Sequence, residues 1–191
     1  MDPATLVEEI VPVAGRDLRL LRPRDAESLL DEEAFEHEEY LPYWAELWPS
    51  GVALARDVSG RALRGARTLE LGCGLGLPSI AAALAGGRVL ATDWSPVAID
   101  LLRDNAARNG VELELDVVSW YAPGRLLERA PFDLVLAADV LYERRNVEAL
   151  AELLPRLGGE VLLADPGRAP LEEFLARRPP VWARPPVYRL S

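Results

Sequence analysis

The sequence predicts an α/β fold, with a Rossmann-like, mostly parallel sheet, helices on both faces and a short N-terminal extension. From residue 61 onward, short apolar segments alternate with helical ones, which is typical of repeated βαβ units. The first of these apolar segments ends in a glycine-rich turn, as the first strand of such folds commonly does. Half of the 191 residues are hydrophobic and 27% are charged, which suits one compact domain with a packed core.

Residues 1–50 are expected to form an extension of strand, helix and lid, and residues 51–191 to form the main compact unit. Within residues 1–30, short apolar runs alternate with turn-forming residues and predict a small strand or hairpin. The acidic stretch 31–39, DEEAFEHEE, is typical of a solvated helical face. It contains the single histidine, His37, which has no second metal ligand within reach, so no metal site is expected.

The main unit is expected to contain five strands of a largely parallel sheet and a terminal hairpin. The segment 132–138 is almost entirely apolar, as expected when helices cover both faces of a strand. Pro96 favours the first turn of a helix and Gly110 its end. The expected strands span 67–71, 88–92, 112–118, 132–138 and 160–164. The expected helices span 78–85, 96–109, 145–154 and 171–177, and the hairpin is formed by 181–183 and 187–190.

Charge and composition argue against several classes of partner. The net charge is −10, so a polyanion is repelled and no nucleic-acid partner is expected. The acidity suits either solubility alone or the attraction of a basic protein segment. No apolar run approaches the roughly 18–20 residues of a membrane-spanning helix, and the N-terminus does not resemble a secretory signal, so no membrane partner is expected. Cys73 is the single cysteine, which favours a reducing cytoplasm.

The glycine-rich loop after the first strand is the first candidate binding element. Glu70 is followed by glycines at every second position, Gly72, Gly74 and Gly76, with Cys73 between them. Glycine allows a tight turn and a close approach of the backbone to a ligand, and the following helix offers free N–H groups. A dinucleotide fingerprint requires its third glycine at position 77, where Leu77 stands. The observed spacing is that of methyltransferases that use S-adenosylmethionine, although a purely structural turn also explains it.

The second strand ends in a carboxylate that is a candidate for ribose binding. Asp93 follows Glu70 by 23 residues, close to the separation of about 20 residues expected for an acid that binds the hydroxyls of a nucleoside. Trp94 comes next and is placed to flank the nucleoside. The alternative role for Asp93 is to cap the helix that begins near Pro96, but Ser95 is better placed for it.

Aromatic residues gather before the first strand and after the third. Residues 40–51 contain four aromatics interrupted by two prolines, which favours a rigid amphipathic lid over a core helix. Within it, Trp44 and Trp48 can hold a sulfonium or an ammonium by cation–π attraction, or simply pack the N-terminal segment on the sheet. Trp120 lies just beyond the third strand, where an adenine ring lies in this type of fold.

Acidic residues follow the fourth and fifth strands. Ala138 and Asp139 end the fourth strand, and Tyr142 comes three residues later. Ligands of open α/β sheets bind at the carboxyl ends of strands, so these side chains are expected near a transferable methyl group, although Asp139 also suits a capping role. The fifth strand ends in Asp165-Pro166-Gly167-Arg168, which is either a plain turn or a motif that places an acid and an arginine at the same sheet edge.

Together these motifs resemble the seven-strand, class I methyltransferases of the protein-lysine type. The chain is similar in particular to the group that methylates the β subunit of electron-transfer flavoprotein, and to bacterial relatives some of which are labelled nicotinamide methylase-like. The resemblance covers roughly residues 35–175. It rests on residues 42–49 (PYWAELWP), Glu70–Gly76, Asp93, Trp120, the Asp139-x-x-Tyr142 motif and Asp165–Arg168.

The resemblance implies a cofactor, S-adenosyl-L-methionine, and roles for the matching residues. It implies that Trp48, Gly72, Gly74, Asp93, Trp120 and Ala138 contact the cofactor, to which the loop and strand ends add Glu70, Cys73, Gly76 and Trp94. Asp139 and Tyr142 are then expected to line the acceptor channel as catalytic residues.

Two activities and one inactive alternative follow. The first is an N-methyltransferase acting on a lysine side chain of a protein, with Asp139 aiming the amine. The second is a methyltransferase for a small amine, nicotinamide-like or other, that uses the same cofactor site. The third is a binding module that keeps the fold without the chemistry, which the intact motifs disfavour.

Overall fold

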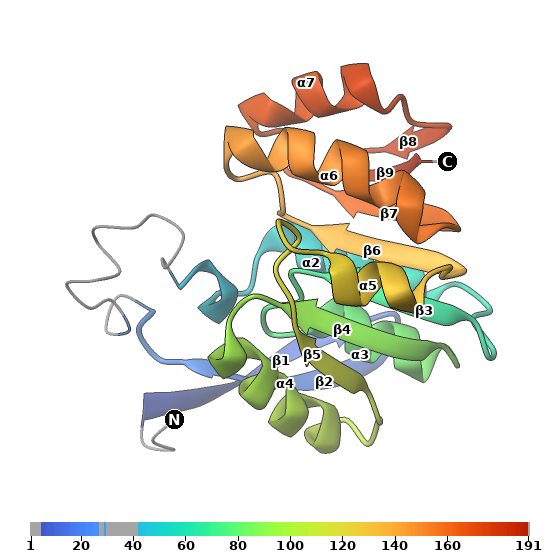
Figure 1. The fold of residues 1–191 in the computed structure, drawn as a ribbon. Helices are drawn as coiled ribbons and strands as arrows, with labels where there is room; N and C mark the ends of the chain where they lie inside the picture. The colour runs from blue at the N-terminus through green and yellow to red at the C-terminus, as the bar shows by residue number, and fades with distance from the viewer. Residues whose placement is uncertain (1–4, 27–28, 30–41, 191) are drawn as a thin grey trace.

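A computed structural model describes residues 5–26, 29 and 42–190 of the chain. The acidic stretch 31–39 and His37, for which a solvated helical face was predicted, lie outside the described residues. The larger of two sheets has seven strands (Figure 1). They are β3 (Arg67–Leu71), β4 (Arg88–Asp93), β5 (Glu114–Val117), β6 (Leu134–Ala138), β7 (Glu160–Ala164), β8 (Trp182–Arg184) and β9 (Val187–Leu190).

The order of strands across this sheet is β5-β4-β3-β6-β7-β9-β8. The five strands from β3 to β7 run parallel, whereas β9 is antiparallel both to β7 and to β8. The α/β prediction is therefore confirmed, and the terminal hairpin completes the sheet. The chain runs from β3 outward to one side and returns through β6 to the other, so β3 and β6 form the switch point at which such folds bind ligands.

Helices cover both faces of the large sheet (Figure 1). Leu69 and Leu71 pack in a cluster with residues of α5, α6 and α7, whereas Glu70, one position between them, bonds to Ser79 of α3 on the opposite face. This alternation follows from the period of two residues in a strand. One face carries α2 (Pro49–Ser59), α3 (Leu77–Leu84) and α4 (Pro96–Arg108), and the other carries α5 (Gly124–Arg129), α6 (Arg144–Leu157) and α7 (Ala169–Arg177).

A separate antiparallel hairpin, β1 (Leu6–Val13) and β2 (Arg16–Pro23), lies against α4. Two asparagine side chains of α4 bind the backbone of β2. Asn105 accepts a hydrogen bond from the N–H of Leu21 and donates one to its carbonyl, and Asn109 does the same with Arg19. Asn105 and Asn109 are four residues apart and lie on the same face of α4, while Arg19 and Leu21 are two residues apart and point to the same side of β2. The two amides therefore line up along the edge of the strand.

The sequence missed two helices and misplaced several boundaries by a few residues. Residues 49–59 were partly interpreted as a lid but form α2, in which Pro49 occupies a first-turn position that does not need its N–H. The short α5 was not predicted. α6 was expected to end at Leu154 but continues through Pro155 to Leu157, whose fully buried side chain belongs to the core. Within the described residues, no helix is both long and apolar enough to cross a bilayer.

Candidate functional site

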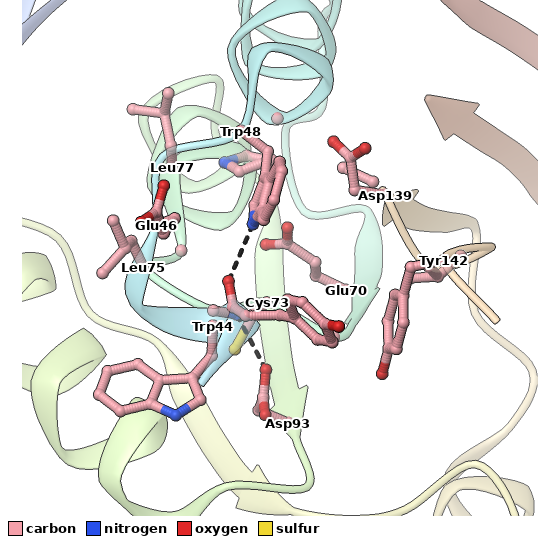
Figure 2. Close-up of a pocket in the computed structure, with 18 of the residues that line it drawn as sticks. Trp44, Glu46, Trp48, Glu70, Cys73, Leu75, Leu77, Asp93, Asp139 and Tyr142 are labelled. Carbon is pink, nitrogen blue, oxygen red and sulfur yellow. Dashed lines mark hydrogen bonds between the residues drawn. The ribbon is translucent and has the colours of Figure 1, made fainter. Parts of the chain in front are cut away.

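A cavity lies at the carboxyl ends of β3, β4 and β6, at the switch point of the sheet (Figure 2). Every residue that the sequence singled out for the site lines this cavity. They are Trp48, Glu70, Gly72, Cys73, Gly74, Gly76, Asp93, Trp94, Trp120, Ala138, Asp139 and Tyr142. Their placement together agrees with a common site, while the role of each residue stays a prediction.

Glycine is required at two positions of the loop, for a different structural reason at each. Gly74 has a φ of 49°, and a Cβ there would lie 3.1 Å from the carbonyl oxygen of Trp44, so the aromatic segment packs directly on the loop. Gly76 has a φ of 78°, and a Cβ would lie 2.0 Å from a methyl group of Leu102. Gly76 thus lets α4 approach the start of α3, a packing role that accompanies its position on the cavity wall.

Glu70 is a buried carboxyl group at the floor of the cavity. Its side chain is 1% exposed and accepts a hydrogen bond from the hydroxyl of Ser79. Burial raises the pKa of Glu70 from its usual 4.5 to about 8, with the Ser79 hydrogen bond opposing the rise. In the absence of a cationic partner, this residue is therefore largely protonated at neutral pH, and a ligand cation nearby favours its ionised form.

Asp93 lies at the end of β4 with both carboxylate oxygens bound to backbone N–H groups. Oδ1 accepts from Ser95 and Oδ2 from Gly74, each at 3.0 Å. Burial raises the pKa of Asp93, and these backbone hydrogen bonds oppose that rise. A carboxylate can accept about four hydrogen bonds, so the group can still accept one from a ligand hydroxyl. Ser95, as expected, takes the capping role by accepting from the N–H of Ala98.

Cys73 and Trp120 lie next to these carboxylates. Burial and the nearby Asp93 raise the pKa of the Cys73 thiol, so the thiol is protonated and unreactive. Trp120 packs over Gly72, where a Cβ would meet its ring at 3.1 Å. The indole N–H of Trp120 is buried without a hydrogen-bond partner, which is unusual for a buried donor and suits a bound ligand with an acceptor at this point.

The aromatic segment forms one wall of the cavity and is fixed by its own contacts. A short helix, η4 (Tyr43–Ala45), precedes Trp48, whose indole N–H donates to the carbonyl of Tyr43 at 2.8 Å. The ring of Tyr43 lies 5.1 Å from that of Tyr142. Trp44 lies on the opposite side of the cavity from Tyr142 (Figure 2). These aromatic side chains can therefore both pack the segment in place and contact a ligand in the cavity.

Asp139 follows β6 in a left-handed backbone conformation, with a φ of 55°. This conformation turns the chain sharply after the strand and is tolerated better by Asp and Asn than by most residues. One carboxylate oxygen, Oδ1, accepts from Arg168 Nη2 at 2.9 Å, and the other, Oδ2, is buried, with the hydroxyl of Ser50 close to the carboxyl group. Asp139 does not cap a helix, since α6 begins at Arg144 after Glu143.

Burial dominates the acid–base properties at this end of the cavity. It raises the pKa of Asp139, and hydrogen bonds from Arg168 and Ser50, together with the charge of Arg168, oppose the rise. Burial also raises the pKa of Tyr142, so its hydroxyl is protonated and able to donate a hydrogen bond. Figure 2 shows Asp139 and Tyr142 on the same side of the cavity, adjoining the end of β6.

Several lining residues were absent from the predicted set. Arg168 and Trp44 were noticed in the sequence without an assigned cofactor contact. Glu46 and Tyr43 belong to the aromatic segment, and only their place in the motif at residues 42–49 could have indicated a position in the site. Additional apolar or small lining residues, which carry no chemical signal of their own, are Leu47, Gly51, Leu75, Leu77, Pro78 and Val140.

Comparison with known proteins agrees with this geometry. The sequence model of a protein family described as "Lysine methyltransferase" matches residues 36–164. The electron transfer flavoprotein beta subunit lysine methyltransferase of Xenopus laevis is 38% identical over 159 residues, which are 80% of this chain and 63% of the relative. The enzyme of the same name from Danio rerio is 36% identical over 144 residues, 72% of this chain and 55% of the relative. The chain thus spans less than two thirds of the length of either relative.

A solved structure supports the fold. The 16S rRNA N2 G1207 methyltransferase of T. thermophilus, in complex with AdoMet and guanosine, superposes with a TM-score of 0.65 at 16% sequence identity. The superposition covers 98% of this chain and 50% of that one. At this identity the likeness concerns the arrangement of strands and helices alone.

Proposed function

The chain belongs to the lysine methyltransferase family, and from this premise we propose that it transfers a methyl group from S-adenosylmethionine to a lysine side chain of a protein. The observation that carries the proposal is the meeting, in one cavity, of the glycine loop, the Asp93 carboxylate and the Asp139–Tyr142 pair. The first two are suited to hold a nucleoside, and the third to receive an amine.

The residues of the cavity fit the cofactor. Asp93 offers a carboxylate to the ribose hydroxyls, and the unpartnered indole N–H of Trp120 is available to the adenine end. Gly72 and Gly74 keep the loop free of side chains where the ligand approaches. The buried carboxyl of Glu70 suits the ammonium of the methionine portion. When bound, S-adenosylmethionine supplies an electrophilic methyl carbon and leaves as a neutral thioether.

The acceptor must be a neutral amine, because its nitrogen lone pair attacks the methyl carbon. With an ordinary pKa of about 10.4, deprotonating lysine at pH 7 costs about 4.6 kcal/mol. The aromatic walls formed by Tyr43, Trp48 and Tyr142 lower this cost by disfavouring the charged form. Asp139 Oδ2 accepts a hydrogen bond from the amine and aims its lone pair, and water takes the proton that is released. Alignment of the reacting atoms accounts for much of the acceleration.

The names of the relatives suggest a specific acceptor. We propose the β subunit of electron transfer flavoprotein as the protein substrate, since the enzymes from Xenopus laevis and Danio rerio are named for it. A protein acceptor is also consistent with the net charge of −10, which opposes association with nucleic acid.

The test is incubation of the protein with methyl-labelled S-adenosylmethionine and the purified β subunit from the same organism, followed by mass spectrometry of its peptides. We expect label on one or more lysines, and none when the Asp139→Asn variant is used. A parallel incubation with a soluble lysate divides the products by size. Label confined to small metabolites overturns the proposal in favour of a small-amine acceptor, and label in another protein overturns only the choice of substrate.

A further inference from the structure

Arg168 is the cationic side chain among the described residues that line the cavity. The same walls carry four carboxyl groups, those of Glu46, Glu70, Asp93 and Asp139. An ammonium group entering such a cavity is stabilised by those of the acids that are ionised, which raise its pKa and work against formation of the neutral amine. A positive charge beside the acceptor end has the opposite effect: it lowers the pKa of the ammonium and favours the neutral amine.

Arg168 is fixed in place from three directions. Its Nη2 donates to Asp139 Oδ1 at 2.9 Å, and its guanidinium carbon lies 5.3 Å from the centre of the Trp48 ring. The turn that presents it is held by Asp165, whose Oδ1 accepts from the backbone N–H groups of Gly167 and Arg168, each at 2.8 Å. The side chain is 29% exposed, so it lies largely within the protein, where charges interact more strongly than in water.

The ion pair leaves one acceptor of Asp139 unused. Arg168 occupies Oδ1, whereas Oδ2 is buried and lies outside the ion pair, with the hydroxyl of Ser50 close to this carboxyl group. A carboxylate oxygen has two lone pairs, so beside the hydroxyl of Ser50 it can accept a hydrogen bond from a ligand in the cavity. The pair thus leaves one oxygen of Asp139 for a ligand, and the positive charge of Arg168 lies on the other oxygen.

We propose that Arg168 is a positioning residue that keeps the acceptor amine neutral: it confines Asp139 to one free oxygen and balances the charge that otherwise favours the ammonium form. The inference rests on the proposed methyl transfer to an amine. The groups that face Asp139 are Arg168 itself and Asp165 from the turn after β7, and Ser50 at the start of α2. Tyr142 lies on the same side of the cavity and stays neutral.

The pH dependence of the rate separates this role from a structural one. In Arg168→Gln, the positive charge is lost while the side chain remains polar. We expect the pH at which kcat rises to increase by about one unit or more. At pH 7 this shift lowers kcat about tenfold, whereas near pH 10 kcat returns to the value of the unchanged protein. Arg168→Lys keeps the positive charge, so its kcat should rise at nearly the same pH as that of the unchanged protein. Arg177→Gln, an exposed arginine at the far end of α7, is the matched control and leaves this pH unchanged.

A second measurement does not need the protein substrate. n-Butylammonium imitates the end of a lysine side chain, and its binding in the presence of S-adenosylhomocysteine is followed by tryptophan fluorescence at pH 7. We expect Arg168→Gln to bind this cation at least several-fold more tightly than the unchanged protein, although it transfers methyl groups more slowly. A merely structural role for Arg168 gives weaker binding instead. If the Gln variant is not folded by circular dichroism, Arg168→Met is used in its place.

The outcomes distinguish this inference from the proposed function. An unshifted pH dependence of kcat together with unchanged or weaker n-butylammonium binding in the neutral variants overturns the role of Arg168 while methylation by the unchanged protein continues. Absence of methyl transfer by the unchanged protein overturns the proposed function. In that case, the binding measurement still decides whether Arg168 repels an ammonium from this end of the cavity.

Discussion

At the scale of single residues, the site contains two buried carboxyl groups with different surroundings. Asp139 is paired with Arg168, which leaves its other oxygen at the acceptor end, whereas the groups that act on Glu70 in the described part of the chain are Ser79 and Asp93, neither of them cationic. Their substitution is therefore expected to have different consequences, one for turnover and the other for the dependence of stability on pH.

Asp139→Asn should abolish methyl transfer and leave cofactor binding nearly unchanged. Asparagine tolerates the left-handed backbone at this position and keeps the size of the side chain, but it lacks the charged acceptor. We expect methyl incorporation to fall by about a hundredfold or more, in line with the loss of an orienting catalytic group. Calorimetric titration with S-adenosylhomocysteine should give a dissociation constant within about threefold of the unchanged value.

The matched control for this substitution is Asp104→Asn, an exposed residue of α4. It removes the same charge from the molecule at a place distant in sequence from the cavity lining, and it should leave turnover unchanged. Full activity of Asp139→Asn would remove this carboxylate from the mechanism.

Glu70 should make the unfolding free energy fall as pH rises from about 4.5 to about 8. Over that interval the folded protein holds a proton on Glu70 that the unfolded chain has released, because burial raises the pKa in the folded state. The loss reaches up to about 1.4 kcal/mol per pH unit. Urea denaturation of the ligand-free protein at pH 5, 6, 7 and 8 measures this slope.

The variant Glu70→Gln cannot ionise and should show a flatter dependence than the unchanged protein. The pKa values of Asp93 and Asp139 are also raised and affect both curves, so the difference between the curves reports Glu70 together with its interaction with Asp93. Parallel curves for the two proteins would contradict a protonated Glu70.

At the scale of elements, α4 connects the N-terminal hairpin to the glycine loop. Asn105 is fully buried; it binds both the N–H and the carbonyl of Leu21 and also donates to the carbonyl of Leu75. A single side chain thus satisfies backbone groups on the edge of β2 and in the loop that lines the cavity. The free edge of a strand otherwise exposes such groups to solvent or to other chains.

Asn105→Ala should destabilise the protein by about 2–4 kcal/mol, because it leaves buried backbone groups without partners. The melting temperature should drop by roughly 5–15 °C for a domain of this size. Asn109→Ala is the matched control: it removes the equivalent pair of bonds to Arg19 at a more exposed position, and water replaces them. Equal losses for both variants would show that burial of Asn105 is not the cause.

At the scale of the whole molecule, the cavity is lined by segments from residue 43 to residue 168. A ligand in it contacts the aromatic segment, the glycine loop and the ends of β4 and β6 at once. Because a ligand that binds only the folded state stabilises that state, S-adenosylhomocysteine at a hundred times its dissociation constant should add about 2.7 kcal/mol.

Differential scanning fluorimetry should then show a rise in melting temperature of roughly 5–10 °C with S-adenosylhomocysteine. Asp93→Asn should reduce the rise, since it weakens the acceptor for the ribose hydroxyls. A comparable rise with a nicotinamide dinucleotide, and none with S-adenosylhomocysteine, would refute the assignment of the cavity.

The sequence was sufficient for the parallel sheet and for the residues at strand ends. Glu70, Asp93 and Asp139 all follow apolar runs, and the carboxyl ends of parallel strands meet at one edge, so their convergence was predictable. The continuation of α6 beyond Pro155 was not, because tertiary burial of Leu157 outweighs the usual cost of proline in a helix.

Interactions of single side chains with distant backbone were likewise beyond the sequence. Nothing in the pattern around Asn105 indicates a partner 84 residues away on β2. The pair between Arg168 and Asp139 joins two turns that follow different strands, and it depends on a turn geometry set by Asp165.

The amides of Asn105 and Asn109 bind only main-chain atoms of β2, and this has an evolutionary consequence. Because these hydrogen bonds do not depend on the side chains of the hairpin, residues at its outward-facing positions can be replaced without loss of the attachment. Ile10, which is 56% exposed, is one such position. The hairpin can acquire new surface chemistry while its attachment stays the same. Among descendants of this gene, we expect the hairpin to vary freely in sequence wherever the two asparagines persist.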